Sequence, residues 1–152
     1  MEDASKVLIM AIKDRNQQLR VVAEILLVHI PDFLDQDAGL ARDLLAVAGT
    51  ALGEIAEDAE QSAKAWDKRA YHVRADEMRR EWDWALAASN YALGLALRPV
   101  PLKAEDLAKL RRLIQPDIAK PARRQITDPA RFRGAAQLVR QQQAQRRKPV
   151  RG

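Results

Sequence analysis

The sequence predicts an all-α protein, and more specifically an up-down four-helix bundle with a basic C-terminal extension. Apolar residues recur at steps of three and four through most of the chain, as in helices that bury one side. Good helix formers abound, whereas alternating apolar and polar stretches are scarce. Apolar residues make up 47% and charged residues 31% of the 152 residues, a balance typical of one folded domain.

The first predicted helix begins at Ser5 or Asp14 and ends at Ile30. We expect Pro31 to end it, because the residue before a proline is pushed out of the helical region. Whether the apolar run 7–12 extends this helix or packs separately stays open at this stage. The predicted buried stripe consists of Leu19, Val22, Ile25, Leu26 and His29, where His29 is interpreted as a satisfied core residue.

The second predicted helix begins after Asp35 or Asp37, because a short carboxylate can accept hydrogen bonds from the first free N–H groups of a helix. It is expected to end near Lys64–Asp67. Small residues between positions 48 and 53 allow another helix to pack closely against this one. The predicted apolar face consists of Ala41, Leu44, Leu45, Ala48, Leu52, Ile55, Ala56 and Ala59.

Two further helices complete the predicted bundle. The third is expected over about Arg69–Leu97, and the two prolines of segment 98–101 stop it because each proline removes a donor. The fourth begins near Leu102 or Lys103, and Pro116 is expected to kink it or to restart it. The predicted apolar residues of the fourth helix are Leu107, Leu110, Ile114 and Ile118.

Positive charge is concentrated at the C-terminal end of the chain. Residues 120–152 carry ten bases and one acid, a net charge of +9, whereas residues 1–119 have a net charge of −4. We therefore divide the chain into a bundle over 1–119 and a basic tail over 120–152. Asp128-Pro129 is a good helix start, so residues 129–147 are a candidate helix. Its apolar set is thin, so we expect it to be frayed alone and ordered on a partner.

The sequence lacks the residues that most classes of enzyme need for catalysis or for metal binding. The absence of cysteine excludes a disulfide scaffold, a thiolate zinc site and a cysteine nucleophile. His29 and His72 are the two histidines, too few for a histidine-rich metal centre. A calcium-binding loop beginning at Asp35 would need glycine in place of Leu40 and glutamate in place of Ala46. We expect no catalytic residue, no metal and no cofactor.

The chain shows no signal for a membrane or for secretion. Its N-terminal apolar run, Val7–Ile12, has six residues, whereas about 18 are needed to span a bilayer. No small-residue cleavage site follows this run. The sequence therefore predicts a cytoplasmic protein.

Two groups of basic residues are candidate phosphate contacts. Such groups commonly meet an anionic partner, most often nucleic acid, since arginine donates two hydrogen bonds to a phosphate. The alternative is a solvated surface with intrahelical pairs such as Asp76–Arg80, followed by a disordered extension. The candidates in the bundle are Lys64, Lys68, Arg69, His72, Arg74, Arg79, Arg80, Arg111 and Arg112. The candidates in the tail are Arg123, Arg124, Arg131, Arg133, Arg140, Arg146, Arg147 and Lys148.

The three tryptophans differ in how well they fit the buried stripes. Trp82 fits the stripe of the third helix, whereas Trp66 and Trp84 fit less well. An indole outside the core can serve a subunit interface, stack on a base, or lie at the edge of the core. The sequence leaves these three roles open.

Two stretches carry a resemblance to a known family. The first is His29-Ile30-Pro31 followed by Gly39-Leu40-Ala41-Arg42-Asp43-Leu44, and the second is Leu95-Ala96-Leu97-Arg98-Pro99 before a short fourth helix. This layout, over Arg15–Ile118, resembles the accessory variability determinant (Avd) proteins of diversity-generating retroelements. It is also similar to the related four-helix proteins encoded by intervening sequences in large ribosomal RNA genes.

The resemblance implies a non-catalytic protein that forms a homopentameric barrel, binds RNA or DNA, and associates with the reverse transcriptase of the element. That enzyme copies a template RNA with adenine-directed errors. The acidic body and long basic tail of this chain depart from the family pattern, so either the barrel surface or the tail could carry the RNA contacts. The alternative function is a protein-interaction adaptor unrelated to reverse transcription, whose tail folds onto an acidic protein.

Overall fold

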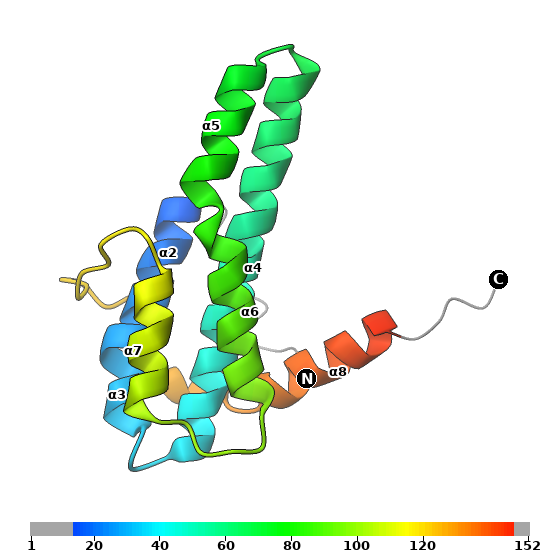
Figure 1. The fold of residues 1–152 in the computed structure, drawn as a ribbon. Helices are drawn as coiled ribbons and strands as arrows, with labels where there is room; N and C mark the ends of the chain where they lie inside the picture. Colours follow the sequence, from blue (N-terminus) through cyan, green and yellow to red (C-terminus); the bar gives the residue numbers. More distant parts are fainter. Residues whose placement is uncertain (1–13, 148–152) are drawn as a thin grey trace.

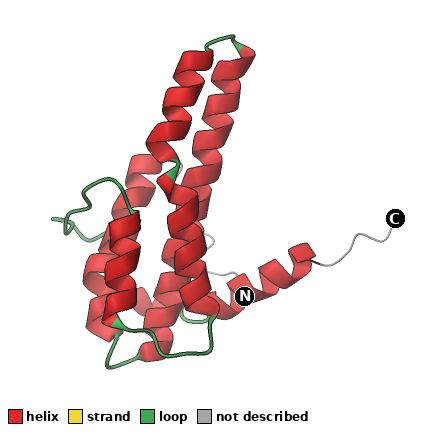
Figure 2. Cartoon of the chain, viewed as in Figure 1, coloured by secondary structure: helices red, strands yellow, loops and turns green. Residues whose placement is uncertain are grey.

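The computed structural model describes residues 14–147, and all its regular elements within that range are helices (Figures 1 and 2). This confirms the predicted all-α class. The elements are α2 (Arg15–Glu24), the π-helical turn η1 (Ile25–His29), α3 (Ile30–Phe33), α4 (Ala38–Lys68), α5 (His72–Trp82), α6 (Trp84–Leu97), α7 (Ala104–Leu113), the 3-10 turn η2 (Pro129–Phe132) and α8 (Ala135–Arg147).

Helix α4 is the central element of the fold. It packs against α2, α5, α6 and α8, and most of its apolar side chains are fully buried. Helix α6 approaches it closely at Gly49, whose carbonyl accepts a 2.7 Å hydrogen bond from Ser89 Oγ. A Cβ atom at Gly49 would lie 2.8 Å from the Leu93 side chain. The small residues of α4 therefore do allow the close neighbour that the sequence predicts.

The first helix does not end at Pro31, contrary to the sequence-based expectation. The chain continues through η1 and α3 as far as Phe33, with Pro31 in the first turn of α3. In the π-helical turn the Ile30 N–H donates to the Ile25 carbonyl, so the regular bonding ladder is already shifted before the proline. A proline is tolerated in the first turn of a helix, because the N–H that it lacks would have no α-helical acceptor there.

The start of α2 and both ends of α4 agree with prediction. Asp14 caps α2 by accepting from the Asn16 N–H at 2.8 Å, and Asp37 caps α4 by accepting from the Leu40 N–H at 3.1 Å. Helix α4 ends at Lys68. The alternative start at Ser5 and the apolar run 7–12 lie outside the described residues.

The third predicted helix is divided into α5 and α6, which flank Asp83. The Trp84 Nε1 donates to the Glu81 carbonyl at 3.0 Å, so the indole bonds a carbonyl that the backbone ladder would otherwise use. Trp82 and Trp84 are both buried, with ring centroids 5.9 Å apart. Of the two indoles outside the predicted stripe, Trp84 is therefore a core residue.

The fourth helix is shorter than expected. Helix α7 ends at Leu113, so Ile114 and Ile118 lie on an irregular segment, although both are buried. Pro116 explains the early end, because it disfavours helical backbone at the residue before it and lacks an N–H to donate.

The C-terminal segment packs on the body in the single chain, whereas we expected it to become ordered on a partner. Glu24 accepts hydrogen bonds from the N–H groups of Gln125 at 2.6 Å and Ile126 at 2.9 Å. Asp43 accepts from those of Gly134 at 2.8 Å and Ala136 at 3.0 Å, which caps the start of α8. The buried apolar residues of this segment are Ile126, Phe132, Ala135, Ala136 and Val139. Helix α8 then points away from the other helices (Figure 1).

Candidate nucleic-acid interface

The first predicted basic cluster lies at the end of the α4–α5 hairpin, which projects beyond the other described helices (Figure 1). Ala63 and Ala75 are fully buried between the two helices and allow a close approach. The Tyr71 N–H donates to the Trp66 carbonyl at 2.9 Å and closes the turn. This geometry leaves a set of basic side chains exposed at the hairpin end: Lys64, Lys68, Arg69, His72, Arg74 and Arg80.

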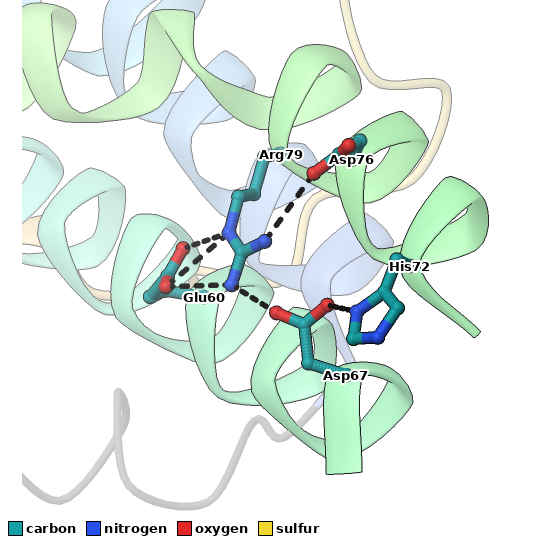
Figure 3. Close-up of polar contacts among 5 residues, drawn as sticks. All are labelled: Glu60, Asp67, His72, Asp76 and Arg79. Carbon is teal, nitrogen blue, oxygen red and sulfur yellow. Dashed lines mark hydrogen bonds and ion pairs between the residues drawn. The ribbon is translucent and has the colours of Figure 1, made fainter. Parts of the chain in front are cut away.

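Arg79 differs from these residues because carboxylates of the fold surround it (Figure 3). Its Nε lies 3.1 Å from Glu60 Oε2, its Nη2 lies 2.8 Å from Asp67 Oδ2, and its Nη1 lies 3.5 Å from Asp76 Oδ1. Hydrogen bonds to Glu60 and Asp67 raise the pKa of Arg79 further above its ordinary value. The charge of Arg79 is thus compensated within the hairpin, which leaves it little capacity for a phosphate.

Asp67 links the turn to both helices of the hairpin. Its Oδ1 accepts a 2.8 Å hydrogen bond from His72 Nδ1, and its Oδ2 accepts from Arg79 (Figure 3). The hydrogen bonds from His72 and Arg79 hold the pKa of Asp67 below its ordinary value. His72 therefore stabilises the hairpin end, and its ring remains largely exposed there.

Trp66 is the centre of an aromatic and cationic group at the same end. The guanidinium carbon of Arg74 lies 4.9 Å and that of Arg69 lies 6.0 Å from the indole centroid, distances at which a cation is attracted to the ring. The Tyr71 ring meets the indole edge-to-face, with centroids 5.7 Å apart. Within residues 14–147, neither arginine has a carboxylate partner.

Arg111 and Arg112 lie on the last turn of α7, at the edge of an open groove. Both are exposed, and neither forms an ion pair within the described part of the chain. The groove has a volume of about 620 Å³ and is mainly apolar; its other lining residues are Leu26, Leu27, Pro31, Leu34, Ala104, Leu107 and Ala108.

The predicted basic residues of the C-terminal segment fall into two groups. Arg133 pairs with Asp37 at 2.7 Å and lowers the pKa of that carboxyl, and Arg140 donates to the Leu97 carbonyl at 3.1 Å. The second group is exposed and has no carboxylate partner among the described residues: Arg123, Arg124, Arg131 and Arg146. Arg147 ends α8, and Lys148 lies outside the described residues.

Two arginines that the sequence did not single out have structural contacts. Arg42 donates to the carbonyls of Leu95 and Ala96, both at 3.1 Å, and to two more carbonyls of the segment after α6. Arg15 pairs with Asp58 at 2.6 Å. Sequence spacing gave no signal for these contacts, because the partners lie more than 40 residues apart.

His29 is a satisfied core residue, as predicted. Its Nε2 donates to Glu24 Oε2 at 2.6 Å, and both side chains are buried. Residues 14–147 contain no cluster of three or more side chains arranged to hold a metal ion. Over the same range no helix combines the length and hydropathy needed to cross a bilayer.

No known protein family, no curated protein and no solved structure matches this chain. Two kinds of basic side chain can be distinguished: those whose charge is compensated within the fold, and those that are exposed and have no carboxylate partner among residues 14–147.

Proposed function

We propose that the chain is a non-catalytic nucleic-acid-binding accessory protein that associates with a reverse transcriptase and its template RNA in a diversity-generating retroelement. The observation that carries the proposal is the exposure, on two separate parts of one helical scaffold, of cations that have no carboxylate partner among residues 14–147. At the hairpin end these are Lys64, Lys68, Arg69, Arg74 and Arg80; on the C-terminal segment they are Arg123, Arg124, Arg131 and Arg146.

Under this proposal, helical segments 15–33, 38–68, 72–97 and 104–113 are the four members of an up-down bundle, and 120–152 is its basic extension. Copies of the bundle assemble into a homopentamer in the cytoplasm. Helix α6 supports self-association, because none of its 14 residues is charged and Leu86 is 57% exposed on it. The exposed positions of α6 are Leu86, Ala87, Asn90 and Gly94, so this side carries no charge that would oppose contact with a second copy.

Binding is mainly electrostatic and only weakly sequence-specific, since cations contact phosphates rather than base edges. A salt series with a structured RNA tests this part of the proposal. We expect affinity to fall steeply as salt rises, with a linear relation between log affinity and log salt. Absence of binding at low salt, or an affinity independent of salt, would remove the proposal.

The reverse-transcriptase partner is tested by co-expression. A reverse transcriptase encoded beside this gene should co-purify with the chain, and a nuclease-treated parallel sample distinguishes direct contact from bridging by RNA. If no reverse transcriptase lies nearby or co-purifies, this part of the proposal fails, whereas RNA binding is judged by the salt series alone.

The apolar groove between α3 and α7 favours a second candidate function, a protein-interaction adaptor. Its leucines and alanines offer a surface of the kind that an amphipathic helix covers, and Arg111 and Arg112 at its edge suit an acidic partner. Purification from nuclease-treated lysate separates the two functions. Retention of a protein partner without any affinity for RNA would favour the adaptor.

A further inference from the structure

The end of the α4–α5 hairpin offers an aromatic surface as well as positive charge. Tyr71 is 57% exposed and Val73 is 73% exposed, although both are apolar in character. Ala70 lies between the two helices with a φ of 63°, in the left-handed region that residues with a side chain seldom adopt. Ala70 is the left-handed residue of a helix C-cap, because its own N–H bonds to the Asp67 carbonyl and the Tyr71 N–H bonds to the Trp66 carbonyl, both at 2.9 Å. This cap fixes the turn between the two helices.

The contacts around Trp66 keep these groups in place. Tyr71 meets the indole edge-to-face at 5.7 Å, and Arg74 lies over the indole at 4.9 Å. His72, which follows Tyr71, bonds to Asp67, and Asp67 in turn bonds to Arg79. The turn is therefore held by contacts on both sides, and little ordering is needed when a ligand binds.

Positive charge surrounds the exposed ring. Lys68, Arg69 and Arg74 lie within three residues of Tyr71, and none has a carboxylate partner within the described part of the chain. Proteins that bind single strands combine the same two elements, cations that contact the backbone and aromatic rings on which bases stack. In a duplex the bases are already stacked inside the helix and are not available to such a ring.

We propose that the end of the α4–α5 hairpin binds unpaired nucleotides, with a base stacked on Tyr71 and the neighbouring phosphates held by Lys68, Arg69 and Arg74. This inference rests on the proposed function and specifies the form of nucleic acid that this site recognises. Arg79 and His72 position the hairpin, and Trp66 supports Tyr71 and Arg74 from the inner side.

The test compares two labelled RNA strands of equal length, about 12 nucleotides, which is within the site size of single-strand binding domains. One strand carries bases throughout, and the other lacks them at its central positions. Both have the same number of phosphates, so electrostatic attraction is matched. Because stacking of one base contributes about 1–3 kcal/mol, the full-length protein should bind the base-bearing strand at least about 5-fold more tightly.

Three variants test whether the preference for the base-bearing strand depends on the Tyr71 ring. Tyr71→Ala should remove most of it, whereas Tyr71→Phe, which keeps the ring, should retain it. Val73→Ala, at a nearby residue that is also exposed, is the matched control and should also retain it. Circular dichroism melting of each variant shows whether the fold is unchanged, and since Tyr71 is exposed we expect it to be.

The results separate the two proposals. Equal affinities of the wild-type protein for both strands, or a preference that Tyr71→Ala leaves intact, would overturn this inference and leave electrostatic RNA binding in place. Failure to bind either strand together with failure to bind structured RNA at low salt would overturn the proposed function, and this inference with it.

Discussion

Glu24 is only 1% exposed, although it carries a carboxylate. It accepts hydrogen bonds from His29 Nε2 and from the N–H groups of Gln125 and Ile126. A buried carboxylate is unfavourable unless its oxygens are bonded, and here both oxygens are. This one residue therefore joins the first helix to a segment about one hundred positions later.

Replacing Glu24 by alanine should lower the free energy of unfolding by about 3–5 kcal/mol, because it leaves a buried histidine and two backbone N–H groups without their acceptor. Urea denaturation measures this loss. Glu57→Ala is the control, since Glu57 is exposed, and it should change stability by less than about 0.5 kcal/mol. Similar small losses for both variants would contradict the role assigned to Glu24.

Asp67 makes the stability of the hairpin depend on pH. Hydrogen bonds from His72 and Arg79 lower its pKa in the folded protein, so the unfolded chain takes up a proton at a higher pH than the folded chain. Its contribution is present above the ordinary carboxyl pKa of about 4 and is lost as the pH falls through the lowered value. The melting temperature of wild type should therefore fall more steeply below about pH 5 than that of Asp67→Asn. Parallel pH profiles would contradict this assignment.

At the scale of elements, the contact between α4 and α6 requires glycine at position 49. A Cβ atom there would lie 2.8 Å from the Leu93 side chain and 3.2 Å from Ala92, distances at which the Leu93 side chain or α6 itself must shift. Gly94 on α6 presents the opposite situation, because nothing lies within 4 Å of a Cβ atom built on it. The two glycines therefore have different roles, although both are helical.

Gly49→Val should lower the free energy of unfolding by about 1–3 kcal/mol through overpacking. Gly94→Ala should raise it by about 0.5–1 kcal/mol, because alanine loses less backbone entropy in a helix. Thermal or urea unfolding of the pair measures both. A destabilised Gly94→Ala variant, or a Gly49→Val variant as stable as wild type, would show that the helix contact is not as described.

The helices and their caps could largely be predicted from the sequence, since apolar period and short carboxylates act over a few residues. The continuation past Pro31 depends on a π-helical turn, for which periodicity has no signal. The same limit applies to the basic cluster at the hairpin end. The residues of the cluster could be named from the sequence, whereas the pairing of Arg79 with Glu60 joins two helices and could be identified only from the fold.

The packing of the C-terminal segment on the other helices could not be predicted from the sequence, for a related reason. Its hydrogen bonds run from backbone N–H groups to Glu24 and Asp43, which are 91 to 102 residues away. Backbone donors are present at nearly every position, so the sequence does not indicate which of them will bond. The small apolar set of the C-terminal segment suffices because Phe132, on η2, and Ala135, on α8, belong to the same buried core as the other helices.

For the whole molecule, the division into an acidic body and a basic C-terminal segment has a structural consequence. Deleting residues 120–152 would remove buried side chains such as Ile126 and Phe132 together with the charge, so deletion confounds stability with binding. Substitution of exposed arginines by glutamine changes charge alone. The structure supplies both kinds of arginine, with and without a carboxylate partner, for such a comparison.

The most direct test of the account is the salt dependence of RNA affinity in two variants. One replaces Arg123, Arg124 and Arg146 by glutamine, and the other replaces Arg133, which pairs with Asp37. Each lost phosphate contact lowers the slope of log affinity against log salt by about 0.7 for single strands. We predict a slope smaller by about 2 for the triple variant and an unchanged slope for Arg133→Gln. A triple variant with the wild-type slope would contradict the claim that the exposed arginines without a carboxylate partner among residues 14–147 bind the nucleic acid.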